Sequence, residues 1–448
     1  MAYVPIGDPD RKRMLRAIGL ERVEDLFSTI PEKYRLRQPL NLPSPHAEPE
    51  LRRRLGDLAR KNTATTGMSC FLGAGAYRHH IPAVVSHLLS RSEFYSSYTP
   101  YQPEISQGTL QAIFEYQTMI CQLTGMEVAN ASLYDGASAL AETILLCRRL
   151  RKGNRVLLAD SIHPHYRQVA ETYCQNLDVE LVTIPHGESG RIDRKILADR
   201  LRKGAAAVIV QSPNFFGVVE DLKELAGSIH GAGALFSVAI TDPICLGILV
   251  PPGEAGADCV FGEAQAFGGE LMFGGPYLGF LATREGFVRQ MPGRLVGLTK
   301  DNEGNPGYVL TLATREQHIR RAKATSNICT NQGLCALGAA VFLSSLGRRG
   351  LREMALQNLH KAHYARKTLA AIDGCSIPFG AEIFNEFVLQ LPADAQVVAD
   401  RLEGRGIIPG LPLGRFFPDL RNSLLVCVTE VTRRQEIDAL AGALREVI

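Results

Sequence analysis

The sequence RVLLAD at residues 155–160 is the first of four apolar runs that decide the fold. The others are ELVTIP at 180–185, AAVIVQ at 206–211 and ALFSVAI at 234–240. Such runs contain few polar residues, which is typical of strands that are buried on both faces of a sheet. The segments between them are long enough for a helix. The pattern therefore predicts a mainly parallel sheet whose strands are joined by crossover helices.

Two of the segments between these runs carry the signals of helix ends. Residues 191–203 place Asp193 in the first turn and end near Gly204, and residues 220–230 end at Gly231. An acidic residue at a helix start and a glycine just past its end satisfy backbone groups that the helix leaves open. Strands and helices therefore alternate along this region, which predicts the α/β fold class.

The chain divides into three parts by composition and hydrophobic pattern. Residues 1–95 are charged and place apolar residues at helical spacing, which predicts an N-terminal helical arm. Residues 96–330 hold the apolar runs and form the predicted large α/β domain. Residues 331–448 predict a smaller C-terminal α+β domain. Its elements are a long helical run at 333–372 interrupted near Gly347 and Gly350, strand-like pieces at 387–391 and 424–428, and an amphipathic segment at 433–447.

The composition excludes several classes of protein. Of the 448 residues, 46% are hydrophobic and 21% are charged, which suffices for a large core. Glycine and proline number 42 and 24, well below the load of fibrous or disordered chains. Lysine and arginine total 49 against 46 acidic residues, which gives a net charge of +3 without a long basic block. We therefore expect no nucleic-acid partner.

The cysteines and the apolar runs indicate the compartment. Ten cysteines are scattered without a C-x-x-C pair, and several lie in apolar runs, where a small buried thiol is ordinary. No apolar run approaches the roughly 18 residues that span a bilayer, and residues 1–20 lack the apolar core of a signal segment. We expect a cytoplasmic protein without a membrane partner.

Three short motifs favour structural roles when they are taken alone. LGAGAYR at 72–78 lacks the third glycine of a dinucleotide fingerprint and follows no strong strand, so a turn that needs glycine freedom is preferred. HH at 79–80 and HPH at 163–165 have no carboxylates or thiols at ligand spacing. We expect these histidines to lie in the core or on the surface, and we expect no metal.

Three polar segments are more informative. ANASLYDGASALAE at 129–142 leads into an apolar helix whose free amides would cradle a phosphate, unless Asp135 or Ser138 is simply an N-cap. Two prolines restrict PYQPEISQG at 100–108, which either lines a site or packs at a boundary. Residues 315–332 gather four basic side chains before a small polar patch. A solvated helix face and an anion or partner contact both stay open there.

Four motifs, in this order along the chain, resemble one protein family. They are YTPYQPEISQG at 98–108, ANASLYDGAS at 129–138, EAQAFG with FGGPYLGF within 263–280, and TREQHIRRAKATSNICT at 314–330. The family is the glycine decarboxylase P protein of the glycine cleavage system. The length and the variant of each motif resemble the separate N-terminal-half (alpha) subunit of enzymes that are split in two. The resemblance covers nearly the whole chain.

The resemblance implies a fold, a cofactor and partners. The fold would be fold type I of the pyridoxal-phosphate-dependent transferases, like that of aspartate aminotransferase. The partners would be the lipoyl H protein and a homologous beta subunit, in a heterotetramer of two alpha and two beta subunits. That assembly is a glycine dehydrogenase (aminomethyl-transferring): it decarboxylates glycine with pyridoxal phosphate and transfers the aminomethyl group to the lipoyl group of the H protein.

The chain departs from the catalytic half of this family at the positions that hold the cofactor. A His-Lys pair precedes the glycine-rich segment there, whereas Ala264 and Gln265 stand at the matching places here. Glutamine cannot form an imine. The acidic partner of the pyridine nitrogen is also absent near Val238, and Asp242 lies beyond it. We therefore expect no catalytic residue on this chain, and we expect the partner subunit to bind pyridoxal phosphate covalently.

The resemblance also suggests which residues reach the partner's site. Cofactor sites of this fold lie at subunit interfaces, so a subunit without the lysine can complete the site and stabilise the complex. The predicted site-completing residues are Tyr98, Tyr101, Glu104, Ser106, Gln107, Thr325, Ser326 and Asn327. The predicted remnants of an old cofactor pocket are Asp135, Gly136, Ala137, Ser138 and His163.

Two other hypotheses stay open. One is a self-sufficient pyridoxal-phosphate-dependent amino-acid decarboxylase that uses Lys300 or Lys323, although both lysines lie in polar, charged sequence. The other is a purely scaffolding subunit that contributes no group to any active site. Activity after substitution in the 98–108 loop would separate scaffolding from site completion.

Overall fold

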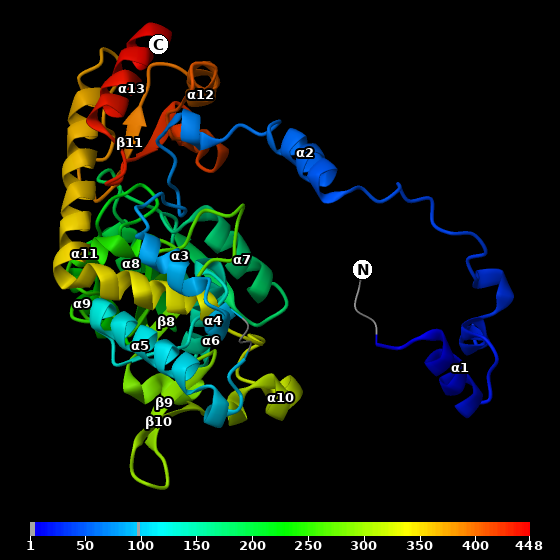
Figure 1. The fold of residues 1–448 in the computed structure, drawn as a ribbon. Helices are drawn as coiled ribbons and strands as arrows, with labels where there is room; N and C mark the ends of the chain where they lie inside the picture. The colour runs from blue at the N-terminus through cyan, green and yellow to red at the C-terminus, as the bar shows by residue number, and fades with distance from the viewer. Residues whose placement is uncertain (1–4, 96–98) are drawn as a thin grey trace. The chain divides into compact units, whose positions relative to one another are not determined.

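The computed structural model describes residues 5–95 and 99–448 of the chain (Figure 1). Two compact units form, Met1–Ala64 and Thr65–Ile448. The first unit contains helices α1 (Asp8–Ala17) and α2 (Glu48–Ala59), with short 3-10 turns between them. Among residues 5–64, Leu15 alone is buried. Helices in the first part of the chain are therefore observed, as the apolar spacing predicts, although they bury almost no side chain within this unit.

The first unit ends nearer the N-terminus than the helical arm predicted over 1–95. Strand β1 (Ser69–Cys70) pairs in parallel with β12 (Ile407–Ile408). Helix α3 (Ala83–Leu89) packs against the long helix α11 (Gly333–Ala370). These partners lie far along the chain and cannot be read from local periodicity. They place residues 65–95 with the second unit.

Seven strands form the central sheet of the second unit, in the order β2-β8-β7-β6-β5-β3-β4. The strands from β4 to β7 in this order pair in parallel, whereas β8 runs antiparallel to both β7 and β2. Their bounds are β2 (Val128–Ala129), β3 (Arg155–Ala159), β4 (Glu180–Ile184), β5 (Ala207–Gln211), β6 (Leu235–Ile240), β7 (Cys259–Glu263) and β8 (Gly279–Thr283). The predicted mainly parallel sheet is confirmed.

Burial explains why the inner strands of this sheet contain few polar residues. Every residue of β5, β6, β7 and β8 is buried, so neither face of these strands meets solvent. Helix α6 packs on β6, β7 and β8, and α9 packs on β6. The helices of this region are α4 (Ser92–Tyr95), α5 (Gln107–Thr124), α6 (Gly136–Leu150), α7 (Pro164–Cys174), α8 (Arg194–Leu201), α9 (Leu222–Gly231) and α10 (Gln317–Arg320).

A second hydrophobic core lies among the C-terminal elements. These are strands β11 (Glu386–Gln390), β13 (Leu411–Pro412) and β14 (Ser423–Cys427), which pair antiparallel, and helices α12 (Ala395–Glu403) and α13 (Arg434–Val447). The core also takes Phe71, Phe215 and Phe216 from earlier parts of the chain. The C-terminal elements therefore depend on the preceding sequence, and a separate domain over 331–448 stays a prediction.

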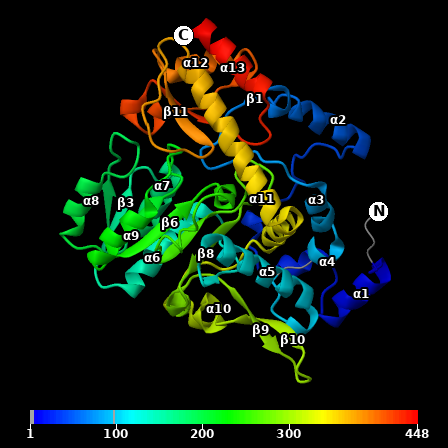
Figure 2. The same ribbon diagram turned by 90° about the vertical axis from the view of Figure 1, so that its left-hand side faces the viewer.

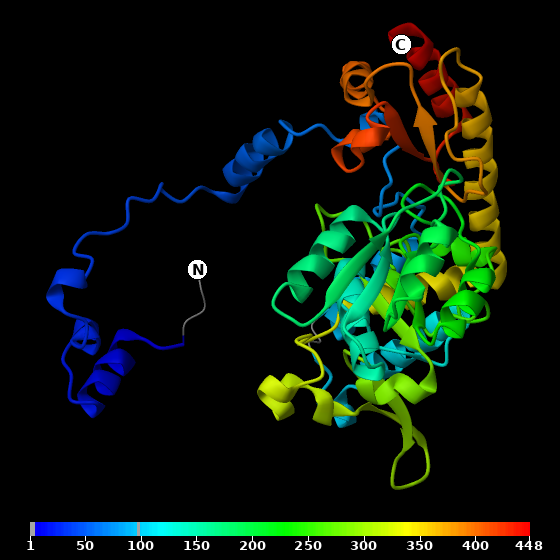
Figure 3. The same ribbon diagram turned by 180° about the vertical axis from the view of Figure 1, so that it is seen from behind.

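Helix α11 connects the two cores, as the yellow-to-orange ribbon of Figures 2 and 3 shows. Its Phe342 and Ala355 belong to the core around the central sheet, and its Ala362 and Leu369 belong to the C-terminal core. The backbone leaves the helical conformation at Gly347, with φ of 61° and ψ of 178°. The predicted interruption near Gly347 is confirmed, because a left-handed φ of this kind favours glycine.

In the described part of the chain, α11 is the one helix long and apolar enough to cross a membrane by length and composition. The expectation that no apolar run approaches the length of a membrane span is therefore corrected for this helix. The apolar 18-residue window is 44% buried. A helix that packs into cores on more than one side carries apolar residues all round, and it passes the same test as a membrane helix.

A hairpin outside the central sheet is fixed by one glutamine. Strands β9 (Leu295–Lys300) and β10 (Pro306–Thr311) pair antiparallel and pack against α5. Gln107 Nε2 donates to the carbonyl of Tyr308 at 2.9 Å, and its Oε1 accepts from the Tyr308 amide at 2.9 Å. The hairpin is thereby aligned with the start of α5, which positions Arg294 directly before β9.

The substitution Gly217→Ala is expected to destabilise the protein by about 2 kcal/mol. Gly217 has a φ of 80°, and a Cβ there would collide with the backbone of Glu386. The control is Gly227→Ala, because Gly227 lies in α9 with nothing within 4 Å of its added Cβ. That change should be neutral or stabilising, since alanine favours a helix. Urea unfolding of both variants checks the prediction, and equal midpoints would contradict it.

Candidate functional site

Polar side chains gather where the parallel strands of the central sheet end. His163 follows β3, Gln211 ends β5, Asp242 follows β6 and Gln265 follows β7. All four are buried. In open α/β sheets, ligands bind at this carboxyl edge of the strands. The edge also contains the start of α6, so it includes all the residues predicted as remnants of a cofactor pocket.

Two carboxyl groups close the start of α6. The Asp135 side chain accepts from the Ser138 amide at 2.7 Å, which makes Asp135 the N-cap. Glu263 Oε2 accepts from the Gly136 amide at 3.1 Å, and its Oε1 accepts from the Leu278 amide at 2.8 Å. Burial raises the pKa of Glu263 to about 7, although these hydrogen bonds oppose the rise. A phosphate here would have to displace both carboxyl groups from the amides.

His163 is held as a neutral imidazole. Its Nε2 lies 2.8 Å from the carbonyl oxygen of Ala74, and its Nδ1 accepts from the His165 amide at 3.2 Å. One neutral tautomer, with the proton on Nε2, satisfies both contacts. Burial lowers the pKa of His163 to about 4. The ring contacts Tyr166 and Phe215, with centroids 4.7 and 5.2 Å away, so aromatic side chains already pack against it.

Gln265 stands where the resemblance implies a Schiff-base lysine, and both ends of its amide have partners. Its Oε1 accepts from the Tyr77 amide at 3.4 Å, and its Nε2 donates to the carbonyl of Gly269. A cavity of about 330 Å³ lies beside it. The lining of that cavity includes Ile81, Val85 and Phe267, and its one charged residue is Glu270. An apolar cavity with a carboxylate does not suit a phosphate.

The chain's own residues 73–80 cross this edge of the sheet; we call them the 73–80 segment. The Tyr77 hydroxyl donates to Glu386 Oε2 at 2.8 Å and lies 3.3 Å from the Thr241 hydroxyl. The His79 ring lies 3.2 Å from Asp242 Oδ2 and 2.8 Å from Glu430 Oε2. Burial lowers the pKa of His79, but the two carboxylates outweigh it and raise the pKa to about 10. His79 is therefore an imidazolium between two carboxylates.

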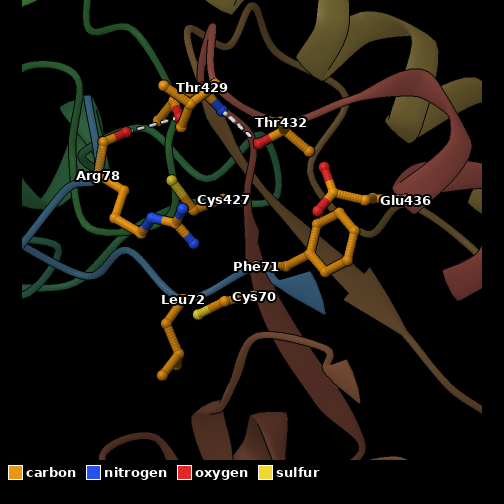
Figure 4. A pocket seen from close by; sticks show the side chains of 9 residues that line it. Cys70, Phe71, Leu72, Arg78, Cys427, Thr429, Thr432 and Glu436 are labelled. Carbon is orange, nitrogen blue, oxygen red and sulfur yellow. Dashed lines mark hydrogen bonds between the residues drawn. The ribbon is translucent and has the colours of Figure 1, made fainter. Parts of the chain in front are cut away.

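Arg78 of the 73–80 segment lies beside Cys427 and Thr429, which are at the end of β14 and just after it (Figure 4). Thr429 donates its hydroxyl to the carbonyl of Arg78 at 2.7 Å, and the Thr429 amide donates to the Thr432 hydroxyl at 3.2 Å. The hollow that these residues line with Cys427 measures about 20 Å³. That is room for a single water. The segment therefore contacts the C-terminal elements as well as the edge of the sheet.

Pyridoxal phosphate does not fit the carboxyl edge of this sheet. The amides at the start of α6 are taken by Asp135 and Glu263, and the ring of His163 is covered by aromatic side chains and by Ala74. No lysine lies between Lys223 and Lys300. Lys300 and Lys323 are both exposed, and neither belongs to this edge. In the described ranges 5–95 and 99–448, no group of three or more His, Cys, Asp or Glu side chains is placed to hold a metal.

A second cluster joins two of the loops predicted to complete a partner's site. Arg294 is only 4% exposed, and its Nη atoms donate to the Tyr101 hydroxyl at 3.1 Å, the Cys329 carbonyl at 2.9 Å and the Thr330 hydroxyl at 2.9 Å. Its guanidinium carbon lies 5.3 Å from the centre of the Tyr101 ring. Glu316 Oε2 balances its charge at 3.7 Å. One guanidinium therefore holds the 99–105 loop against residues 329–331.

The other predicted site-completing residues lie around this cluster with different degrees of contact. Glu104 and Asn327 are exposed, and Ser106 is the N-cap residue of α5 without a side-chain cap bond. The Ser326 hydroxyl accepts from the Ile328 amide at 3.0 Å, and the Thr325 amide donates to the Arg315 carbonyl at 3.0 Å. Tyr98 lies outside the described residues. Gln107 is hydrogen-bonded to Tyr308 in the β9–β10 hairpin.

Three residues of these clusters carry no sequence signal for their role. Arg294 lacks a motif, although it stands as the one charged residue in the apolar stretch 291–298. Tyr77 belongs to the predicted glycine turn and His79 to the histidine pair, and neither motif predicts a role at the carboxyl edge of the sheet. Their hydrogen-bond partners lie 163 or more residues away in the chain, and no local sequence pattern predicts such contacts.

Comparisons with known proteins agree over the full length of the chain. A family model described as glycine cleavage system P-protein matches residues 1–444. A protein of Moorella thermoacetica named "Probable glycine dehydrogenase (decarboxylating) subunit 1" is 52% identical over 448 residues, which cover 100% of both chains. A protein of Geobacillus kaustophilus with the same name is 50% identical over 442 residues, 99% of this chain and 98% of the relative.

Solved structures give the same result. A crystal structure of glycine decarboxylase (P-protein) of the glycine cleavage system, in inhibitor-bound form, matches with a TM-score of 0.91 and 44% identity over 100% of both chains. A sphingosine-1-phosphate lyase of Burkholderia pseudomallei matches with a TM-score of 0.65 and 16% identity over 94% of each chain, which shows the fold alone. The predicted fold class, that of fold type I pyridoxal-phosphate enzymes, is confirmed. The chain belongs to the glycine cleavage system P-protein family.

Proposed function

We propose that this chain is the subunit without cofactor in a two-subunit glycine dehydrogenase (decarboxylating). Relatives at 49–52% identity are named as subunit 1 of that enzyme, which supports a partner subunit. Pyridoxal phosphate is the cofactor of the family and supplies the electron sink for decarboxylation. We propose that the homologous second subunit binds it covalently, in an assembly of two copies of each subunit. Glycine is the substrate, and the lipoyl group of the H protein accepts the aminomethyl group.

The observation that carries this proposal is the closed carboxyl edge of the central sheet. Gln265 cannot form an imine, and its amide is held by Tyr77 and Gly269. The hypothesis of a self-sufficient decarboxylase requires a lysine near this edge. Lys300 ends β9 in the hairpin outside the sheet, and Lys323 lies in an exposed turn. Neither position favours that alternative.

The cluster around Arg294 supports a site-completing role. Tyr101 is 58% exposed although its hydroxyl and ring both contact the buried Arg294. A side chain that is held rigidly and still presented to the outside can take part in a site shared with a partner. We propose that the 99–108 loop and residues 325–327 border the partner's active site. A reducing cytoplasm is the proposed compartment, since all ten cysteines are free.

Reconstitution with the second subunit tests the proposed function. The complex is incubated with pyridoxal phosphate and reduced with borohydride, and the adduct is located by mass. We expect an adduct only on the partner, and decarboxylation of glycine only in the mixture. A lysine adduct on this chain, together with decarboxylation of glycine when the partner subunit is absent, would contradict the proposal.

Tyr101→Ala is expected to lower turnover of the reconstituted complex at least about tenfold, because a tenfold change needs only about 1.4 kcal/mol. The matched control is Tyr364→Ala. Tyr364 has the same pair of contacts, since its hydroxyl accepts from Arg434 at 3.1 Å and its ring lies 5.0 Å from the Arg434 guanidinium carbon. Unchanged turnover of both variants would favour the purely scaffolding hypothesis over site completion.

A further inference from the structure

We propose that the 73–80 segment is an internal occupant of the carboxyl edge: it fills the place where this fold holds a ligand and ties the central sheet to the C-terminal core. The missing lysine is then only one of two barriers to a cofactor. The other is a length of the chain itself. The contacts of the segment on its two sides carry the argument.

On its inner side, the segment bonds to residues that follow the parallel strands. The Ala74 carbonyl lies 2.8 Å from His163 Nε2, beyond β3. The Tyr77 hydroxyl lies 3.3 Å from the Thr241 hydroxyl, beyond β6, and the Tyr77 amide donates to Gln265 beyond β7. Three strand ends are thus spanned by the four residues from Ala74 to Tyr77, in the manner of a ligand at this edge.

On its outer side, the segment bonds to the C-terminal elements. The Ala74 amide donates to Glu386 Oε1 at 2.6 Å, and the Tyr77 hydroxyl donates to Glu386 Oε2 at 2.8 Å. The His80 amide donates to Glu430 Oε1 at 2.5 Å. Glu386 is buried, which raises its pKa to about 7. A buried carboxyl whose two oxygens both bind one segment would lose those bonds if the segment left.

The glycines of the segment allow this close fit. A Cβ at Gly75 would lie 2.7 Å from the His163 ring, and Gly75 has a φ of 95°. A Cβ at Gly73 would lie 2.6 Å from the Cβ of Cys427 and would also collide with Glu386. Glycine is therefore required at both places, because any side chain would meet the ring or the strand. Tyr77 is the buried residue of the segment, and the two glycines let its backbone approach His163 and Cys427 closely.

The charges around the segment also oppose an anionic ligand. His79 lies between Asp242 and Glu430, and Asn385 Nδ2 donates to the same Asp242 oxygen at 2.6 Å. Lys361 donates to the backbone carbonyl of Glu430 and leaves its carboxylate to His79 and His80. A phosphate beside His79 would meet the carboxyl groups of Asp242 and Glu430, which already bind that imidazole.

Amide hydrogen exchange tests the occupant directly, in the full chain. The amides of Ala74, Tyr77 and His80 should exchange as slowly in the wild-type protein as those of the central strands, because they are hydrogen-bonded in a packed region. His79→Gln removes the cation between Asp242 and Glu430, and should speed their exchange about a hundredfold while β5 and β6 stay protected. The matched control His80→Gln alters only an exposed side chain and should change nothing.

Two results of that measurement would overturn the proposal. One is fast exchange of the three amides in the wild-type chain, which would mean that the segment is open. The other is their protection by pyridoxal phosphate added to the wild-type chain, which would mean that the cofactor binds at this edge. These readings concern only this chain, so they stand even where the proposed reaction of the complex fails.

Restoring the lysine gives a second, independent test. Gln265→Lys should form no borohydride-reducible adduct with pyridoxal phosphate, because the segment and the carboxyl groups still occupy the edge. Far-ultraviolet circular dichroism confirms that the variant is folded before the adduct is sought. An adduct at residue 265 would overturn the proposal, since the lysine alone would then be sufficient.

Discussion

The Arg294→Met variant is expected to lose about 3–5 kcal/mol of its free energy of unfolding. The wild-type guanidinium is buried, and it donates to the Tyr101 and Thr330 hydroxyls and to the Cys329 carbonyl. Methionine fills similar volume but donates nothing, so these acceptors and the carboxylate of Glu316 lose their partner. Urea unfolding of the purified chain measures the loss.

Two further variants serve as controls for the loss of stability in Arg294→Met. Arg294→Lys keeps the charge but not the planar fork, so it should recover only part of the stability. Arg289→Met removes an exposed arginine that precedes Arg294 by five residues, and it should change stability by less than about 0.5 kcal/mol. A wild-type midpoint for Arg294→Met would show that the two loops are not held by this side chain.

The pH dependence of stability is expected to reveal His79. Its pKa is about 10 in the folded protein against an ordinary value of 6.5, because Asp242 and Glu430 outweigh the effect of burial. The folded state therefore binds a proton that the unfolded state gives up above pH 6.5. The stability from this group is fully present below 6.5 and is lost as the pH rises toward 10. Between pH 6.5 and about 9.5, the loss should be roughly 3 kcal/mol.

Comparison with His79→Gln isolates this contribution. The buried carboxyls Glu220, Glu263 and Glu386, whose pKa values burial raises to about 7, also remove stability as the pH rises from 4.5 to 7, but they do so in both proteins. The difference in unfolding free energy between wild type and variant should therefore shrink steadily above pH 6.5. A constant difference across this range would contradict a charged His79.

The apolar runs predict β3, β5 and β6 because strands buried on both faces exclude most polar residues, and β4 is predicted by its run although it is a partly exposed edge strand. The same reasoning does not single out β7 and β8, whose runs contain Gly262 and Gly279. A Cβ at Gly262 would collide with the backbone of Ile240, and one at Gly279 with that of Asp135. Glycine in these strands reflects the close approach of a neighbouring backbone, which is a fact of tertiary structure. From the local sequence alone, such a glycine would be interpreted as the end of a strand.

The candidate site is likewise only partly predictable from the sequence. The absence of a lysine at Gln265 is visible in the sequence, and the resemblance selects the loops that contain Tyr101 and Ser326. Their positions relative to a partner's active site stay a prediction. The single side chain that joins two of these segments, Arg294, carries no periodic signal. Neither does the 73–80 segment, whose partners Thr241 and Glu386 lie far along the chain.

The pairing of β1 with β12 also governs how the chain can fold as it is made. Ser69 and Cys70 leave the ribosome early, yet Ile407 and Ile408 must be translated before the strand pair closes. Phe71, which is fully buried in the finished protein, has Leu425 and Val426 in its core and stays exposed until then. Contacts of such long sequence separation form slowly. A nascent chain of this protein therefore carries unsatisfied apolar surface for most of its synthesis, the condition that chaperones relieve.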